Sequence, residues 1–114
     1  MMAELGELAV EAEVDGWAGP GSVAYSPPSL DAAESFLSIF PATFPSPEVS
    51  IHPDGLFSLE WYVGPRRAFS VTFLDGRRLA YSGLFDSLTT HGSEVLHQPV
   101  PPAVVEYLQR LYGE

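Results

Sequence analysis

Three residues of this chain have types and a spacing that could bind a metal: His91, Glu94 and His97, each three positions from the next. Side chains alternate between the two faces of an extended segment, so the histidines would share one face and Glu94 would point away from them. The chain has no cysteine, and zinc sites in proteins are built chiefly from cysteine and histidine ligands that converge. The sequence therefore predicts no metal site and no cofactor.

A glycine-rich segment, DGWAGPGSVAYSPPS at residues 15–29, could be a loop that cradles a phosphate. Such a loop needs successive backbone amides that lead into a helix, with a lysine or arginine nearby. Here Pro20 removes one amide, two more prolines precede the next helix, and the neighbouring charges are all negative. We therefore predict a structural role, in which an extended segment turns at Gly19 and Gly21 around a buried Trp17.

Glu60 is the carboxylate best placed for chemistry, because it lies in the middle of a predicted strand at residues 56–63. Alternation places it on a polar face with Tyr62, and the predicted register sets it opposite Thr72. General acid–base catalysis needs a second titratable group within reach, and none is expected on this face; no serine lies in a strand–turn–helix elbow either. We predict that the chain is not an enzyme and that Glu60, Tyr62 and Thr72 belong to a docking surface. The alternative is a sheet face that is only solvated.

The charge of the chain is divided unevenly along its length. The formal net charge is −10, and all five basic residues are arginines. The segment up to residue 65 contains no basic residue and ten acids: Glu4, Glu7, Glu11, Glu13, Asp15, Asp31, Glu34, Glu48, Asp54 and Glu60. Such a field repels nucleic acid phosphates and favours a protein partner with a basic surface. We place further partner contacts at Glu4, Glu7, Glu11, Glu13 and Asp15, although acidity alone also aids solubility.

Three segments have the periodicity of helices. Residues 3–13 place apolar side chains at helical spacing between acids, although a short alternation within them would also suit a strand. Ser29 is predicted as the N-cap of a second helix, which ends before Pro41. A third helix is predicted at 102–112, where a proline at the first position is well tolerated.

Strands are predicted where apolar and polar residues alternate: 49–51, 56–63, 69–73 and 79–83. A five-residue loop at 64–68 sets Val63, Trp61 and Leu59 opposite Phe69, Val71 and Phe73. A three-residue loop at 75–77 then sets Phe73 and Val71 opposite Leu79 and Tyr81. Trp61 lies on the apolar face and is predicted to be structural. Residues 85–98 hold a predicted turn at 90–92 and a short fourth or fifth strand.

These elements predict one α+β domain over residues 1–114. Its core is an antiparallel meander of three to five strands, with the N-terminal helices and a C-terminal helix packed on one face. The N-terminus lacks the basic region of a signal peptide, and no apolar run approaches the length of a membrane span. We therefore expect a cytoplasmic protein without membrane contact.

Several short motifs are arranged in a recognisable order: Asp15-Gly16-Trp17-Ala18-Gly19-Pro20-Gly21, Pro53-Asp54-Gly55, Leu59-Glu60-Trp61 and Tyr81-Ser82-Gly83. The chain resembles a group of small, largely uncharacterised bacterial proteins with a W-x-G-x-G start, a PDG turn, an L/F-E-W strand and a Y-x-G strand. The resemblance covers about residues 15–112 and implies an accessory member of a toxin–antitoxin or defence gene pair. Pro20 departs from the pattern and stiffens the loop.

The function predicted from these observations is protein–protein interaction. The chain would act as an acidic module, antitoxin- or inhibitor-like, that binds and neutralises or scaffolds a basic partner protein and does not bind nucleic acid directly. A second hypothesis is a mimic of nucleic acid, which requires carboxylates at phosphate-like intervals on one exposed face. A third, a small enzyme, requires a deep pocket that brings Glu60 together with a histidine.

Overall fold

The computed structural model describes residues 2–113, which form three helices and five strands. The helices are α1 (Met2–Glu11), α2 (Pro27–Ser38) and α3 (Pro102–Gly113). The strands are β1 (Glu48–Ile51), β2 (Phe57–Gly64), β3 (Arg67–Phe73), β4 (Arg78–Phe85) and β5 (Leu88–Val95). The strands pair in the order β1-β2-β3-β4-β5, and every pairing is antiparallel. The predicted α+β meander is thus confirmed, at the upper end of its strand number.

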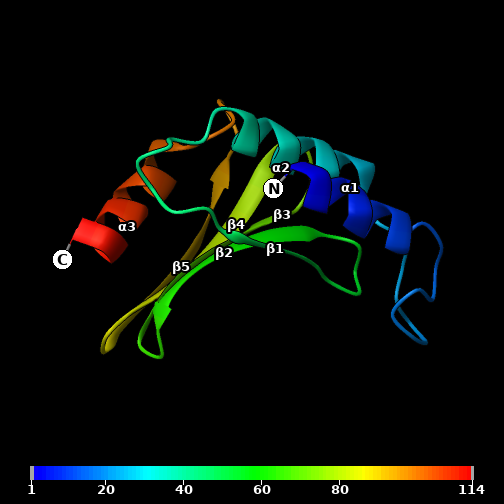
Figure 1. The fold of residues 1–114 in the computed structure, drawn as a ribbon, viewed down its shortest axis with the longest axis horizontal. Helices are drawn as coiled ribbons and strands as arrows, with labels where there is room; N and C mark the ends of the chain where they lie inside the picture. The colour runs from blue at the N-terminus through cyan, green and yellow to red at the C-terminus, as the bar shows by residue number, and fades with distance from the viewer. Residues whose placement is uncertain (1, 114) are drawn as a thin grey trace.

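All three helices lie on the same face of the twisted sheet (Figure 1). α1 contacts β1, α2 contacts β2 and β3, and α3 contacts β3 and β4. The core is formed by two sets of side chains: the alternate strand residues that face the helices, and the apolar residues on the facing sides of the helices. The largest fully buried side chains of this core include Trp61, Phe36, Phe57, Phe69, Phe73, Leu59, Leu79 and Leu108. Because the helices all lie on one side, no element of residues 2–113 covers the opposite face of the sheet.

The pairing of β2 with β3 differs from the predicted register by two residues. Leu59 lies opposite Val71 and Trp61 lies opposite Phe69, because the hairpin closes between Gly64 and Arg67 with an irregularity after Tyr62. The predicted five-residue loop is therefore wrong. Val63, which was predicted to lie on the apolar face, is exposed. A shift of two residues leaves every side chain on the same face, so alternation alone could not reveal the error. The predicted pairing of β3 with β4 is confirmed.

The turn predicted at residues 90–92 is also misplaced, because these residues lie within the continuous strand β5. The chain instead reverses at Asp86 and Ser87, between the paired residues Phe85 and Leu88. Asp86 has a φ of 60°, a left-handed conformation that aspartate tolerates better than most residues and that tight hairpins require.

The N-cap of α2 is Ser26, three residues earlier than predicted. Its hydroxyl accepts a hydrogen bond from the Ser29 amide, and prolines occupy the first helical positions, where a missing amide hydrogen costs nothing. Ser29 is inside the helix and fully buried. Its hydroxyl donates to the Phe73 carbonyl at 2.6 Å and accepts from the Phe57 amide at 2.9 Å. The serine predicted as a cap therefore joins α2 to two strands.

The glycine-rich segment is compact rather than extended over its first half. Residues 12–21 form successive turns, and only 22–26 are extended. Gly19 and Gly21 have φ values of 110° and 89°, which glycine adopts without the steric cost of a side chain. Trp17 is intermediate between buried and exposed and lies outside the core, so the predicted burial is found only in part. The segment closes on itself beyond the end of α1 (Figure 1), and the Trp17 indole donates to the Val23 carbonyl within it.

This position predicts a modest effect of Trp17→Ala. We expect the free energy of unfolding to fall by about 1–2 kcal/mol, because Trp17 lies outside the core and one peripheral hydrogen bond is lost. Urea denaturation followed by circular dichroism measures the change. A loss equal to that of a core aromatic, about 3–5 kcal/mol, would contradict the peripheral placement of Trp17.

Candidate functional site

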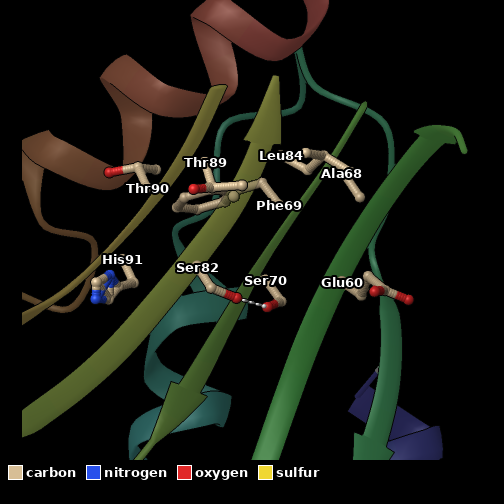
Figure 2. Close-up of a pocket in the computed structure, with 10 residues that line it drawn as sticks. Glu60, Ala68, Phe69, Ser70, Ser82, Leu84, Thr89, Thr90 and His91 are labelled. Atoms are coloured by element: carbon tan, nitrogen blue, oxygen red, sulfur yellow. Dashed lines mark hydrogen bonds between the residues drawn. The ribbon is translucent and has the colours of Figure 1, made fainter. Parts of the chain in front are cut away.

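The candidate site is the face of the sheet opposite the helices, here called the uncovered face. It carries the alternate residues of each strand: Glu48 and Ser50 of β1, Ser58, Glu60 and Tyr62 of β2, Ala68, Ser70 and Thr72 of β3, Ala80, Ser82 and Leu84 of β4, and Thr89, His91 and Ser93 of β5. Most of these side chains are small. A shallow hollow of about 370 Å³ opens in the middle of the face, between Glu60 on one side and His91 on the other (Figure 2).

One row of directly opposed residues crosses all five strands of this face. It runs from Glu48 through Glu60, Ser70 and Ser82 to His91. The hydroxyl groups of Ser70 and Ser82 are 3.1 Å apart and share a hydrogen bond (Figure 2). The row therefore has two carboxylates at one end, short hydroxyls in the middle and an imidazole at the other end.

This row corrects two predictions about Glu60. Its partner on β3 is Ser70, and Thr72 lies opposite Ser58 in the next row. Glu60 is also not the lone titratable group of the face, because Glu48 and His91 share its row. The Pro53-Asp54-Gly55 turn could have revealed Glu48: the His52 amide bonds to the Leu56 carbonyl across it, and counting back from this pair sets residue 48 opposite residue 60. His91 was missed because the preceding turn was misplaced.

Glu60 and His91 do not form a catalytic pair. Three strand spacings separate them, which places their backbones roughly 14 Å apart. A general acid and a general base must both reach the reacting atoms through hydrogen bonds or one water, and only the two serine hydroxyls lie between. Within residues 2–113, no three histidine or acidic side chains gather where they could hold a metal ion.

The opposition of Glu48 and Glu60 is electrostatically unfavourable. Like charges directly opposite on neighbouring strands destabilise a sheet, and in the described part of the chain neither carboxylate forms an ion pair with an arginine or histidine. Both line a second hollow of about 330 Å³ with the aromatic residues Tyr62 and Tyr112. Pro45, which borders the hollow, is fixed by a 3.0 Å hydrogen bond from the Trp61 indole to its carbonyl.

This hollow, which we call the Glu48–Glu60 hollow, has the composition of a site for a cationic side chain. Two carboxylates can accept the paired donors of a guanidinium group, and a tyrosine ring attracts a cation through its face. Tyr62 is 61% exposed, so its ring is accessible to a partner. The predicted anchors Glu60 and Tyr62 are therefore brought together, with Glu48 added to them.

The acids of α1 lie on a different surface. Glu4, Glu7 and Glu11 line an open groove of about 540 Å³ between α1 and Val49 of β1. α1 is on the covered side of the sheet (Figure 1), whereas Glu48 and Glu60 are on the uncovered face. The predicted partner-binding residues thus divide into two sets that flank β1 from opposite sides.

The last two predicted contacts, Glu13 and Asp15, belong to the turns after α1. Glu13 is exposed. One carboxylate oxygen of Asp15 accepts a hydrogen bond from the Ala24 amide at 2.9 Å, so this residue also holds the segment together. Their role in binding a partner stays a prediction.

A cluster of hydroxyl groups on the covered side joins α3 to the sheet. The Thr90 hydroxyl lies 3.2 Å from that of Tyr107, and Tyr81 also hydrogen-bonds Tyr107. These bonds from Thr90 and Tyr81 lower the pKa of Tyr107, while the bond to Tyr107 raises the pKa of Tyr81. Either hydroxyl of the Thr90–Tyr107 pair can be the donor. The cluster positions α3 and brings no acid or histidine within hydrogen-bonding distance.

The fold and the site define an α+β protein with an antiparallel five-stranded sheet, helices on one face and an open polar surface on the other. No helix among residues 2–113 is both long enough and apolar enough to cross a membrane. Comparison with known proteins matches the chain to no family model, no curated protein and no solved structure.

Proposed function

We propose that this chain is an acidic interaction module of the cytoplasm that binds and neutralises a basic partner protein, in the manner of an antitoxin or inhibitor. The observation that carries the proposal is the uncovered face, where two opposed glutamates without an ion-pair partner among residues 2–113 lie beside an exposed tyrosine. A cation from the partner would relieve the repulsion between these two carboxylates. Binding would therefore remove an unfavourable interaction that is present in the free protein.

The flatness of the uncovered face supports binding of a protein rather than of a small molecule. Sites for small molecules are deep and mostly apolar, whereas the central hollow here is shallow and lined by Glu60, Ser70, Ser82, Thr89 and His91 among others. Small side chains let the backbone of a partner approach the sheet closely. The charged hollow at one end would then fix the position of that partner.

The proposal predicts that Glu48→Gln combined with Glu60→Gln weakens binding of the partner at least tenfold. Loss of one side of a desolvated charge pair costs about 2–5 kcal/mol, and both carboxylates are removed here. The partner is first captured from host cells with the tagged wild-type chain. Its affinity for the purified wild type and for the variant is then measured by calorimetry at two salt concentrations, because screening weakens charge pairs that stay exposed.

Asp31→Asn combined with Glu34→Gln is the matched control. It removes the same charge from α2, on the covered side of the sheet, and should change the affinity less than twofold. Failure to recover any stoichiometric partner would contradict the function. Equal weakening by both double variants would leave the function in place but contradict the site, because only total charge would then matter.

A mimic of nucleic acid is the second candidate function, and one observation favours it. Glu4, Glu7 and Glu11 line the same groove and follow one another along α1 at rises of about 4.5 and 6 Å, comparable to a row of phosphates. This function predicts that the captured partner binds DNA or RNA. It also predicts that the double variant Glu7→Gln and Glu11→Gln no longer competes with nucleic acid for that partner. A partner without affinity for nucleic acid would contradict it.

A further inference from the structure

The two edges of the sheet are built differently. β1 has four residues, follows Pro47, precedes Pro53, and is contacted by α1. Short strands, prolines and a covering helix are the usual means by which a sheet edge is protected from pairing with another chain. The β1 edge is therefore blocked.

The β5 edge lacks most of these protections, although the Thr90 hydroxyl is hydrogen-bonded to Tyr107 of α3 on the covered side. β5 has eight residues and pairs with β4 at every position from Arg78–Val95 to Phe85–Leu88 without irregularity. Its sequence, LTTHGSEV, contains no proline, no lysine or arginine and a single acid, Glu94. A long, regular and nearly uncharged edge strand is a template for strand addition.

The backbone groups that this edge presents can be assigned. Hydrogen-bonded and non-hydrogen-bonded pairs alternate in an antiparallel ladder, and the pair that closes a two-residue hairpin is hydrogen-bonded, which here is Phe85–Leu88. The Leu96 amide donates to the Arg77 carbonyl at 2.6 Å, in agreement with this phase. The even-numbered residues of β5 therefore bond to β4, and Thr89, His91 and Ser93 direct their amides and carbonyls outward.

The distribution of charge indicates what can approach this edge. The whole net charge is in the first 65 residues, which include α1, α2, β1 and β2, whereas the segment from β3 to α3 is balanced. If two copies of the chain met at β1, their acidic residues would face each other. If they met at β5, the acidic residues of the two copies would lie at opposite ends of the dimer. Leu88 and Val95, which are 68% and 53% exposed, add apolar area at both ends of β5.

We propose that β5 pairs with β5 of a second copy of this chain, antiparallel and about a two-fold axis perpendicular to the sheet. The result is one continuous sheet of ten strands, since each copy has five. His91 lies at the middle of β5, so the two copies of this residue are close to the axis. The two-fold axis keeps both uncovered faces on the same side, and the central hollows, which Thr89 and His91 border, become neighbours. The assembly is independent of the function proposed above.

The first test is the mass in solution. Light scattering should give twice 12.4 kDa for the wild type, with dissociation on dilution. His91→Pro removes an outward amide and no bond to β4, and proline is tolerated on an edge strand; the variant should be monomeric. Ser93→Lys, which places a charge on the edge, should also be monomeric if the proline variant fails to fold. A monomeric wild type at all concentrations overturns the proposal.

The second test locates the contact. The chain has no cysteine, so a single introduced cysteine reports on one position. Under mild oxidation, His91→Cys should form a disulfide-linked dimer in high yield, because the two copies of this residue lie opposite each other at the two-fold axis. Val10→Cys, also exposed but on α1, is the control and should form no disulfide-linked dimer. A wild-type dimer in which His91→Cys does not cross-link, or in which the proline and lysine variants still dimerise, overturns the β5 interface.

Discussion

Replacing Trp61 by alanine should lower the free energy of unfolding by about 3–5 kcal/mol, the cost of removing a large buried aromatic side chain. Trp61 is 1% exposed. Its ring centroid lies 6.2 Å from that of Phe36, 5.4 Å from Phe40 and 6.3 Å from Phe69, so it joins α2 to the middle of the sheet. Its indole also fixes Pro45 beside the Glu48–Glu60 hollow, so stability and the proposed site depend on one residue.

Urea denaturation followed by circular dichroism measures the effect. Trp61→Phe is the companion variant, because it keeps an aromatic ring and should cost only about 1–2 kcal/mol if the alanine variant is too unstable to measure. Trp17→Ala provides the contrast within the same chain. Equal losses for the two tryptophans would contradict the assignment of Trp61 to the core and of Trp17 to the periphery.

The sequence was informative wherever one face of an element had to be apolar. Alternation in β2, β3 and β4 predicted which residues are buried, since a slip of one position would expose them all. The three-residue loop at 75–77 also set the pairing of β3 with β4, including Phe73 with Leu79. The fold class follows from these patterns, because a sheet with one apolar face must be covered on that face.

Register was harder to predict where it depended on the backbone of a single turn. A shift of two residues between β2 and β3 preserves both faces, so the irregularity beside Val63 was invisible to the pattern. At the β4–β5 hairpin, Thr90 and Gly92 resembled turn residues, but Asp86 supplies the left-handed conformation. Because of the first error, Thr72 was predicted in the row that contains Glu60. Because of the second, His91 was not predicted there.

The site residues follow from topology rather than from local motifs. Glu48 is separated from Glu60 by eleven positions in the sequence, and only the pairing of β1 with β2 brings the two together. The glycine-rich segment was more conspicuous, yet its distinctive residues serve its own turns. Residues with conspicuous local patterns are thus structural in this chain, and those of the candidate site are inconspicuous.

The sheet has different chemistry at its two edges. Acids gather on both sides of β1, through Glu48 on the uncovered face and the α1 carboxylates on the other. β5 carries a single charge and little protection. Because the strands follow one another in sequence order, a basic partner at β1 and a second copy at β5 can bind at the same time. A dimer would then present two acidic ends to the same or to two partner molecules, and avidity would strengthen the complex.

Ser29→Ala should lower the free energy of unfolding by about 2–4 kcal/mol, a large effect for the loss of one oxygen atom. The paired positions of β2 and β3 end at Ser58–Thr72, and Phe57 would face Phe73 in the next pair. The Ser29 hydroxyl is inserted there, donating to the Phe73 carbonyl and accepting from the Phe57 amide. Its removal leaves a buried donor and a buried acceptor unpaired, each at a cost of about 1–3 kcal/mol.

Two readouts distinguish this inserted hydroxyl from an ordinary helix serine. Denaturation gives the loss of stability, and hydrogen exchange should show that the Phe57 amide loses protection in the variant before other β2 amides do. Ser26→Ala, which removes the N-cap, should cost about 1 kcal/mol, and Ser38→Ala, at the exposed end of α2, should cost almost nothing. If Ser29→Ala is as mild as Ser38→Ala, the strands have closed to form a direct Phe57–Phe73 bond, and the hydroxyl is not needed to join α2 to the sheet.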